Sequence, residues 1–228
     1  ILQQQLPEAI ITSYTDYQEE ELLELLEWAD VICIGSGIGT GEVSQKLVKK
    51  TLEGRKVPCL IDADGLNILA GHPEYLRECA DPSGRTGCGL VLTPHMKEMS
   101  RLTGRSIEEL KEDRMRILEG YTDRFGCTCV LKDSRTAAVS PQEGICVNQS
   151  GNASMAKAGA GDVLAGVIAG LMAQGLQSHS AAALGTYLHG RSGDLARAAK
   201  GSYSVMAGDL LTYLSEAFRS LEGEDPKG

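Results

Sequence analysis

The chain has few aromatic residues, no long apolar run and no excess of positive charge. Aromatic residues make up 4% of its 228 residues, and the formal net charge is −9. An acidic balance without a basic run or a stripe of basic and aromatic residues argues against a nucleic-acid footprint. No stretch approaches the roughly 20 apolar residues of a membrane span, and no signal peptide is visible. We therefore expect neither a nucleic-acid partner nor a membrane partner.

The cysteines also lack the spacing that metal ligands require. Their number is odd, seven, and they are scattered along the chain, which is typical of reduced thiols in a cytoplasmic protein. Cys127 and Cys129 alternate along a predicted strand and are expected to be small buried side chains on one face. Because no linker, repeat or low-complexity tract divides the chain, we predict a single globular domain over residues 1–228.

Short apolar runs alternate with helical patterns over most of the chain. Four runs bounded by turn residues predict buried parallel strands at 31–34, 58–61, 90–92 and 129–131. Amphipathic segments predict helices at 19–28, 42–52, 107–118, 163–174, 180–199 and 206–219, and segments 136–140 and 144–147 predict a hairpin. This succession predicts an α/β fold with three layers, in which helices cover both faces of a mostly parallel sheet.

Each predicted parallel strand is followed at once by a polar or glycine-rich segment. These segments are 35–39 (GSGIG), 62–67 (DADGLN), 93–98 (TPHMKE) and 132–136 (KDSRT). In open α/β sheets, ligands bind beyond the carboxyl ends of the strands. The coincidence predicts one ligand-binding edge built from all four segments.

A fifth segment, residues 156–168 (AKAGAGDVLAGVI), has a glycine-rich loop, one aspartate and then an apolar helix. The start of a helix has unpaired N–H groups and partial positive charge. Gly159 and Gly161 let that backbone wrap around a phosphate, and Asp162 would lie beside it. Gly175 is expected to end the helix. A glycine turn packed closely against a sheet is the alternative.

Several single residues admit two interpretations each. Gly35, Gly37 and Gly39 do not form a dinucleotide fingerprint, because Thr40 stands where a third glycine is needed. They favour close approach of backbone to a ligand over a simple tight turn. Asp62 and Asp64 would point to opposite faces of a continuing strand, so at most one enters a shared site; helix capping is the alternative.

Thr93 and Pro94 predict the N-cap and first residue of a helix. His95 and Glu98 would then share one side of its first turn, where His95 could contact a substrate. Glu98 could hold a hydrated Mg²⁺ ion or merely complement the helix dipole. Lys132 could contact a phosphate or be a solvated strand end. The other histidines, which have no partner motif, are expected on the surface or in packing: His72, His179 and His189.

In this order, the segments closely resemble the ADP/ATP-dependent NAD(P)H-hydrate dehydratases, a branch of the ribokinase-like superfamily. The matching segments are 34–39 (IGSGIG), 61–69 (IDADGLNIL), 92–104 (LTPHMKEMSRLTG), 130–136 (VLKDSRT), 158–175 (AGAGDVLAGVIAGLMAQG) and 187–196 (YLHGRSGDLA). The resemblance covers nearly the whole chain. It implies a repair enzyme that uses ADP or ATP to phosphorylate the hydroxyl of hydrated NADH or NADPH, called NAD(P)HX, and then eliminates phosphate to restore the cofactor.

The resemblance also implies roles for individual residues. Asp162 would be the general base, and Glu98 would help to hold Mg²⁺ through water. The substrate site would include Gly37, Gly39, His95 and Asp162. The adenine-nucleotide site, with backbone N–H groups stabilising the phosphoryl group, would comprise Lys132, Asp133, Ser134, Arg135, Thr136, Gly159, Ala160 and Gly161. A homo-oligomer, most simply a tetramer, and a fused or separate NAD(P)HX epimerase are further expectations.

The chain departs from the family pattern at three places. Family members usually show GPG where this chain has Gly35-Ser36-Gly37, and KG where it has Lys132-Asp133. Their domains also begin with a further strand and a glycine-rich segment, and we find neither before Leu6. We therefore expect either that the chain lacks its native N-terminal strand or that part of the site comes from elsewhere. Two other functions stay open: a ribokinase-like kinase of a vitamin or sugar alcohol, and an inactive nucleotide-binding regulatory protein.

Overall fold

A six-stranded sheet forms the centre of the molecule. The computed structural model describes residues 4, 6–11, 18–78, 89–141 and 143–222. The strands lie side by side in chain order, and the first four are parallel while the last three form an antiparallel meander. They are β1 (Ile32–Ile34), β2 (Cys59–Ile61), β3 (Leu90–Leu92), β4 (Thr128–Leu131), β5 (Ala137–Ser140) and β6 (Gly144–Val147). The predicted strands and hairpin are confirmed to within one residue at each end.

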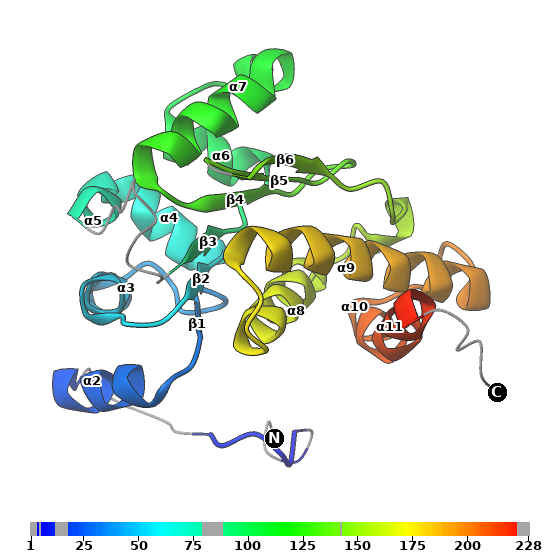
Figure 1. Cartoon of the computed structure of the whole chain (residues 1–228), viewed down its shortest axis with the longest axis horizontal. Helices are drawn as coiled ribbons and strands as arrows, with labels where there is room; N and C mark the ends of the chain where they lie inside the picture. The colour runs from blue at the N-terminus through cyan, green and yellow to red at the C-terminus, as the bar shows by residue number, and fades with distance from the viewer. Residues whose placement is uncertain (1–3, 5, 12–17, 79–88, 142, 223–228) are drawn as a thin grey trace.

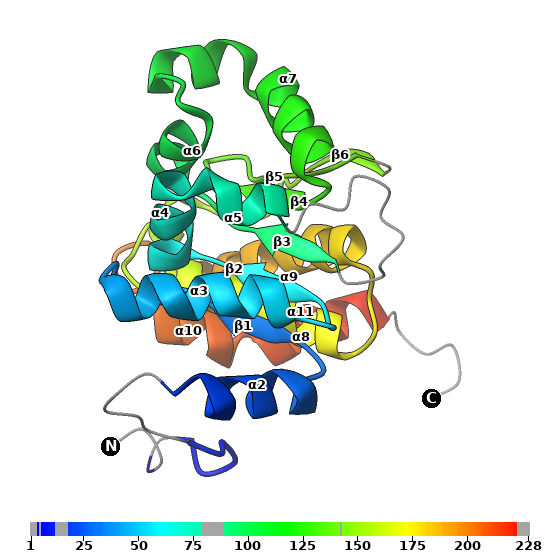
Figure 2. The same ribbon diagram turned by 90° about the vertical axis from the view of Figure 1, so that its left-hand side faces the viewer.

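Helices cover both faces of the sheet (Figures 1 and 2). Side chains such as Ile61 and Leu92 pack against one layer, whereas Leu60 and Val91 pack against the other. The first layer contains α3 (Glu42–Gly54), α4 (Ala63–Gly71), α5 (Pro73–Glu78), α6 (Met96–Thr103) and α7 (Ile107–Phe125). The second contains α8 (Ala160–Ala173), α9 (Ser178–Lys200) and α11 (Leu214–Glu222). The predicted three-layer architecture is confirmed.

The remaining helices lie outside these two layers. Helix α2 (Glu19–Trp28) packs on α3, and α10 (Ala207–Thr212) packs against α8 and α9. A short 3₁₀ turn, η1 (Ala153–Met155), precedes α8. No helix in the described part of the chain has the length and apolar character needed to cross a membrane.

Some helix boundaries differ from the prediction because tertiary packing overrides the local pattern. The predicted helix at 206–219 is divided into α10 and α11 at Tyr213, whose ψ is 0°. Helix α7 continues past the predicted end because Tyr121 and Phe125 are buried in the core. Cys127 and Cys129 are buried in the same core cluster, as predicted. The described cysteines are free thiols: Cys33, Cys59, Cys127, Cys129 and Cys146.

The closest helix crossing in the second layer joins α8 to α9. A Cβ placed on Gly185 of α9 would lie 2.6 Å from Ile168 Cγ1 and 3.4 Å from Ile168 Cα. Ile168 is fully buried against the sheet. The absent side chain at Gly185 therefore lets α9 press α8 onto the strands.

This crossing predicts that Gly185→Ala lowers the free energy of unfolding by about 1–3 kcal/mol, because an added methyl overpacks a filled core. Gly170→Ala is the matched control, since nothing lies within 4 Å of a Cβ at that position of α8. The control should be neutral or stabilising by up to about 1 kcal/mol. Chemical denaturation measures both changes, and equal effects would contradict the packing argument.

Candidate active site

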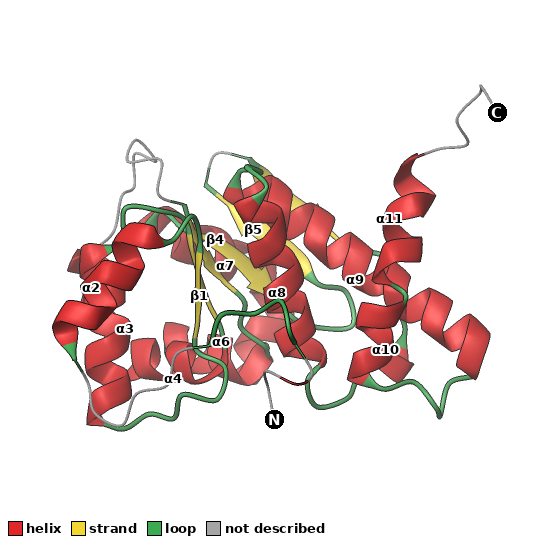
Figure 3. Ribbon diagram, turned by 90° about the horizontal axis from the view of Figure 1, so that it is seen from below, coloured by secondary structure: helices red, strands yellow, loops and turns green. Residues whose placement is uncertain are grey.

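The segments that follow the four parallel strands meet at one edge of the sheet, as predicted. The backbone N–H of Asp62 donates to the carbonyl of Ile34, and that of Thr93 donates to the carbonyl of Ile61. Further along the edge, the Lys132 N–H donates to the Pro94 carbonyl at 2.8 Å. The glycine-rich start of α8 also reaches this region, because α8 packs on β1 and β2 and against α10 (Figure 3).

An ion pair crosses this edge between two side chains that are 70 positions apart in sequence. Lys132 Nζ lies 2.6 Å from Asp62 Oδ1, and Asp62 is only 2% exposed. Asp64 has a different partner, because its Oδ2 accepts the N–H of Gly39, a predicted substrate-site residue, at 2.9 Å. The strand ends at Ile61 and α4 begins at Ala63, so the two aspartates do not alternate along a strand as expected; Asp62 contacts Lys132 and Asp64 contacts Gly39.

Helix α8 begins directly beside this ion pair. Gly159 is its N-cap, with a φ of +87° that favours glycine. A Cβ on Gly161 would lie 3.4 Å from Lys132 Nζ and 3.9 Å from Asp62 Oδ2. Asp162, in the first turn, is exposed, and its carboxylate has no hydrogen bond or ion pair to any residue that the structure describes. This end of α8 thus places the positive end of the helix dipole beside the Lys132 ammonium, with the unpartnered Asp162 carboxylate in the same first turn.

A cavity of about 750 Å³ opens next to this helix end. Its volume suits a nucleotide-sized ligand. The predicted site residues that line it are His95, Lys132, Asp133, Ser134, Thr136, Ala160 and Gly161. Asp162 lies on another side of α8, where it borders an apolar groove of about 440 Å³ with Val163 and Phe218. Gly37, Gly39, Gly159 and Arg135 are absent from both linings.

His189 lines the cavity, although the sequence analysis gave this histidine no partner motif and no role. Its Nε2 donates to the Ala160 carbonyl at 2.9 Å. Burial is the main cause that lowers the pKa of His189 to about 4; the hydrogen bond that His189 donates to Ala160 opposes this shift, and the Lys132 ammonium adds to it. His189 is therefore a neutral residue whose hydrogen bond holds the start of α8. We had expected it only on the surface or in packing.

A network of amides supports the loop between β6 and α8. Asn148 Nδ2 donates to the Thr186 carbonyl at 3.1 Å, and Asn152 Nδ2 donates to Asp194 Oδ1 at 2.9 Å. Both asparagines line the cavity. Sequence reasoning missed them because an isolated asparagine carries no signal until the loop is placed on α9.

Helix α6 corrects the predicted helix start. The N-cap is His95 and not Thr93, and Nδ1 of His95 accepts the N–H groups of Lys97 and Glu98 at 3.1 Å each. Thr93 and Pro94 still bond to neighbouring strands through their backbones. The chain therefore stays extended for two residues longer than predicted, and the helix begins at Met96.

Glu98 belongs to the same cap, which bears on the predicted magnesium site. Its Oε2 accepts the His95 N–H at 2.7 Å, its Oε1 lies 3.4 Å from His95 Nε2, and the residue is only 6% exposed. No group of three or more His, Cys, Asp or Glu side chains in the described ranges could hold a metal ion. These residues do not fit a resident magnesium cage, whereas Mg²⁺ that arrives on nucleotide phosphates needs few protein ligands. A water-mediated role of Glu98 stays a prediction.

Asp133 occupies the position where the family pattern has glycine. Its Oδ2 lies 3.0 Å from Arg114 Nη1, and its Oδ1 accepts the N–H of Ser134 at 2.8 Å. The side chain therefore ties the 132–136 loop to α7. This contact holds the loop at the cavity rim without blocking it.

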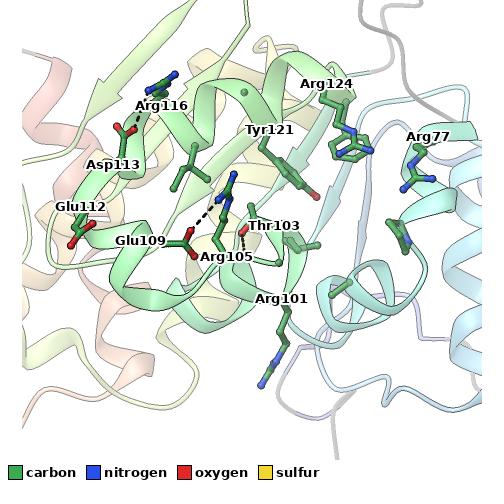
Figure 4. Close-up of a pocket in the computed structure, with 17 residues that line it drawn as sticks. Arg77, Arg101, Thr103, Arg105, Glu109, Glu112, Asp113, Arg116, Tyr121 and Arg124 are labelled. Carbon is green, nitrogen blue, oxygen red and sulfur yellow. Dashed lines mark hydrogen bonds and ion pairs between the residues drawn. The ribbon is translucent and has the colours of Figure 1, made fainter.

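A second large cavity, of about 790 Å³, lies between α5, α6 and α7 (Figure 4). Arginines dominate its polar lining, but three of them already have partners. Arg105 pairs with Glu109 at 3.0 Å, Arg116 with Asp113 at 3.8 Å, and Arg101 donates to an amide oxygen on α4 at 2.6 Å. None of the predicted site residues lines this cavity, so it is not part of the candidate site.

Comparison with known proteins first defines the class. A ribokinase-like superfamily protein of Enterococcus faecalis superposes on 96% of this chain and 72% of its own, with 29% identity and a TM-score of 0.77. An ADP/ATP-dependent NAD(P)H-hydrate dehydratase of Bacillus subtilis, co-crystallised with ATP and Mg²⁺, superposes on 84% of this chain and 64% of its own, with 27% identity and a TM-score of 0.71. The fold is ribokinase-like.

The family model described as NAD(P)H-hydrate dehydratase matches residues 1–216, and the chain belongs to this family. A bifunctional NAD(P)H-hydrate repair enzyme of Moorella thermoacetica is 41% identical over 98% of this chain, which spans 41% of that enzyme. An ADP-dependent (S)-NAD(P)H-hydrate dehydratase of Neisseria meningitidis is 36% identical over 91% of this chain, which spans 70% of that protein.

The depressed pKa of His189 predicts an acid-sensitive fold. Between pH 6.5 and about 4 the unfolded state binds a proton at this residue and the native state does not, so stability falls as the pH is lowered through this window. The loss is up to about 3 kcal/mol. His189→Gln keeps a donor for Ala160 but does not titrate, so its unfolding free energy should fall less over the same window. Parallel curves for the two proteins, from denaturation at several pH values, would rule this explanation out.

Proposed function

We propose that this chain carries out the ADP- or ATP-dependent dehydration of NAD(P)HX to NAD(P)H. The observation that supports it most is the start of α8, where Gly161 and the Lys132 ammonium border a nucleotide-sized cavity and the next residue, Asp162, has an unpartnered carboxylate. The family membership and the names of the relatives agree with this reaction.

In the proposed reaction, the substrate hydroxyl oxygen attacks the terminal phosphorus of the nucleotide, and the bond from that phosphorus to the nucleotide breaks. Asp162 takes the hydroxyl proton. The first N–H groups of α8 and the Lys132 ammonium stabilise the charge on the transferring phosphoryl group. Elimination then breaks the carbon–oxygen bond and releases phosphate, while the neighbouring ring carbon loses a proton to solvent and the double bond of the reduced ring forms. Mg²⁺ would neutralise nucleotide phosphate charge.

The predicted binding assignments extend this proposal. Residues 132–136 and the start of α8 would bind the adenine nucleotide, and Gly37, Gly39 and His95 would border the hydrated dinucleotide. Ser134, Thr136 and His189 support the first assignment, because they line the same cavity as Lys132. A cytoplasmic location and a tetrameric assembly belong to the proposal through the family resemblance, and so does an epimerase partner, since several relatives are named bifunctional.

The test uses the full-length natural protein. When it is incubated with NADHX or NADPHX, Mg²⁺ and ADP or ATP, the absorbance of the reduced nicotinamide ring should return. Inorganic phosphate should appear in equal amount. Reactions without nucleotide are the control. A stable phosphoester in place of phosphate would indicate a small-molecule kinase, and saturable nucleotide binding without turnover would indicate a regulatory protein; either result would exclude the dehydratase.

Asp162→Asn should lower kcat by about 10²–10⁴-fold, because an amide of the same shape cannot accept the hydroxyl proton. Binding of ATP, followed by calorimetry, should stay close to that of the unchanged protein, since the helix start and Lys132 remain in place. If ATP binding falls as much as kcat does, Asp162 supports the structure of the loop and is not the base.

A further inference from the structure

Asp62 occupies a helix N-cap position but does not cap the helix. It precedes α4, where an aspartate ordinarily accepts N–H groups of the first turn, yet its side chain makes no capping hydrogen bond. Its Oδ1 bonds instead to Lys132 Nζ at 2.6 Å, across the sheet edge. A buried carboxylate has thus been turned away from its local partners and toward the candidate site.

The backbone around Asp62 is held in an unusual conformation. Ala63, the next residue, has a φ of +50° and is the one non-glycine residue with a positive φ in the described ranges. A Cβ on Gly35 would collide with the Asp62 carbonyl oxygen, and a Cβ on Gly65 would lie 2.6 Å from Ile61 Cγ2. Strained backbone that the surroundings hold in place is found mainly at functional sites. The backbone at Asp62 is therefore closely packed against Gly35, and the residue after it is held in a left-handed conformation.

Asp62 is the negative group that compensates two positive features next to it. The Lys132 ammonium is held against the positive end of the α8 dipole, near Gly161. Asp62 offsets these two positive features, and its second oxygen, Oδ2, faces the same glycine. An anion that bound between Lys132 and the start of α8 would meet both positive features at once.

Cys33 on β1 indicates that both aspartates act on the same region. The pKa of its thiol is raised to about 11, mainly by desolvation and in part by the carboxylates of Asp62 and Asp162. Cys33 pairs in register with Leu60, whose side chain faces α8. The Cys33 side chain therefore faces the α8 side of the sheet, within electrostatic range of both Asp62 and Asp162.

We infer that Asp62 is a positioning residue for phosphoryl transfer, which holds the Lys132 ammonium against the start of α8 so that the transferring group meets both. This inference rests on the proposed function. It assigns a second carboxylate to the reaction: Asp162 accepts the proton, whereas Asp62 never touches the substrate and acts through Lys132.

The test compares Asp62→Asn and Asp62→Glu with the unchanged protein. Asp62→Asn should lower kcat by roughly 10²-fold, the scale expected when a reacting or stabilising group is displaced by about 1 Å. The same variant should bind ATP and inorganic phosphate more tightly, because Lys132 loses its carboxylate partner. Asp62→Glu, which keeps the charge, should recover part of kcat and return binding toward its original strength. A merely structural role would not strengthen anion binding.

Asp209→Asn is the matched control. Asp209 on α10 forms an aspartate–lysine pair with Lys200 on α9 at 2.7 Å, outside the candidate site. It should leave both kcat and ATP binding unchanged. Thermal unfolding checks that each variant is folded. Should Asp62→Asn be unfolded, Lys132→Arg takes its place: it keeps the charge and the pairing but shifts the cation, so kcat should fall while ATP still binds.

Two results would overturn the inference. The first is an unchanged kcat in folded Asp62→Asn, or in Lys132→Arg where that variant replaces it. The second is a loss of kcat in Asp62→Asn without stronger binding of ATP and phosphate. The binding measurements do not depend on turnover. If the unchanged protein restores no NAD(P)H, the proposed function fails, and the affinities of the variants for ATP still decide whether Asp62 controls the charge at the start of α8.

Discussion

The burial of α8 against the sheet is the constraint on which the candidate site depends. Leu164, Ile168 and Leu171 of this helix pack onto Leu60 and neighbouring strand residues, and each buried side chain of this size contributes about 1.5–3 kcal/mol. The polar start of the helix is thereby fixed at the carboxyl edge of the sheet. The polar residues at the start of α8 contribute little to stability themselves. They can still be held in place for a reaction, because the apolar part of the helix fixes their position.

The sequence predicts the layers, the parallel strands and the common edge well, because these follow from local patterns. Apolar runs bounded by turns mark β1 to β4, and parallel pairing carries the segments after them to one edge. The glycines and the aspartate at the start of α8 are likewise recognisable in sequence. Where packing competes with local pattern, prediction fails. Helix α7 extends to bury Tyr121 and Phe125, and α6 begins at Met96 because Pro94 remains bonded to Lys132, the residue after β4.

The rest of the site is beyond local reasoning, since it depends on which way side chains turn after the chain has folded. Nothing near Asp62 in sequence indicates a partner 70 positions away. His189 acquires its meaning only when α9 crosses α8 and brings its ring to the Ala160 carbonyl. The resemblance to the dehydratases supplied roles for several loop residues, yet it indicated neither of these two contacts.

The conformation of Ala63 has a consequence for how this protein can evolve. A left-handed alanine costs roughly 1–2 kcal/mol relative to glycine at the same place, so a stabilising substitution is a single codon change away. Selection for heat resistance alone would favour that change, although the freer backbone would loosen the residue before it. An alanine kept at this position would then indicate that a fixed Asp62 side chain matters more to the protein than the added stability.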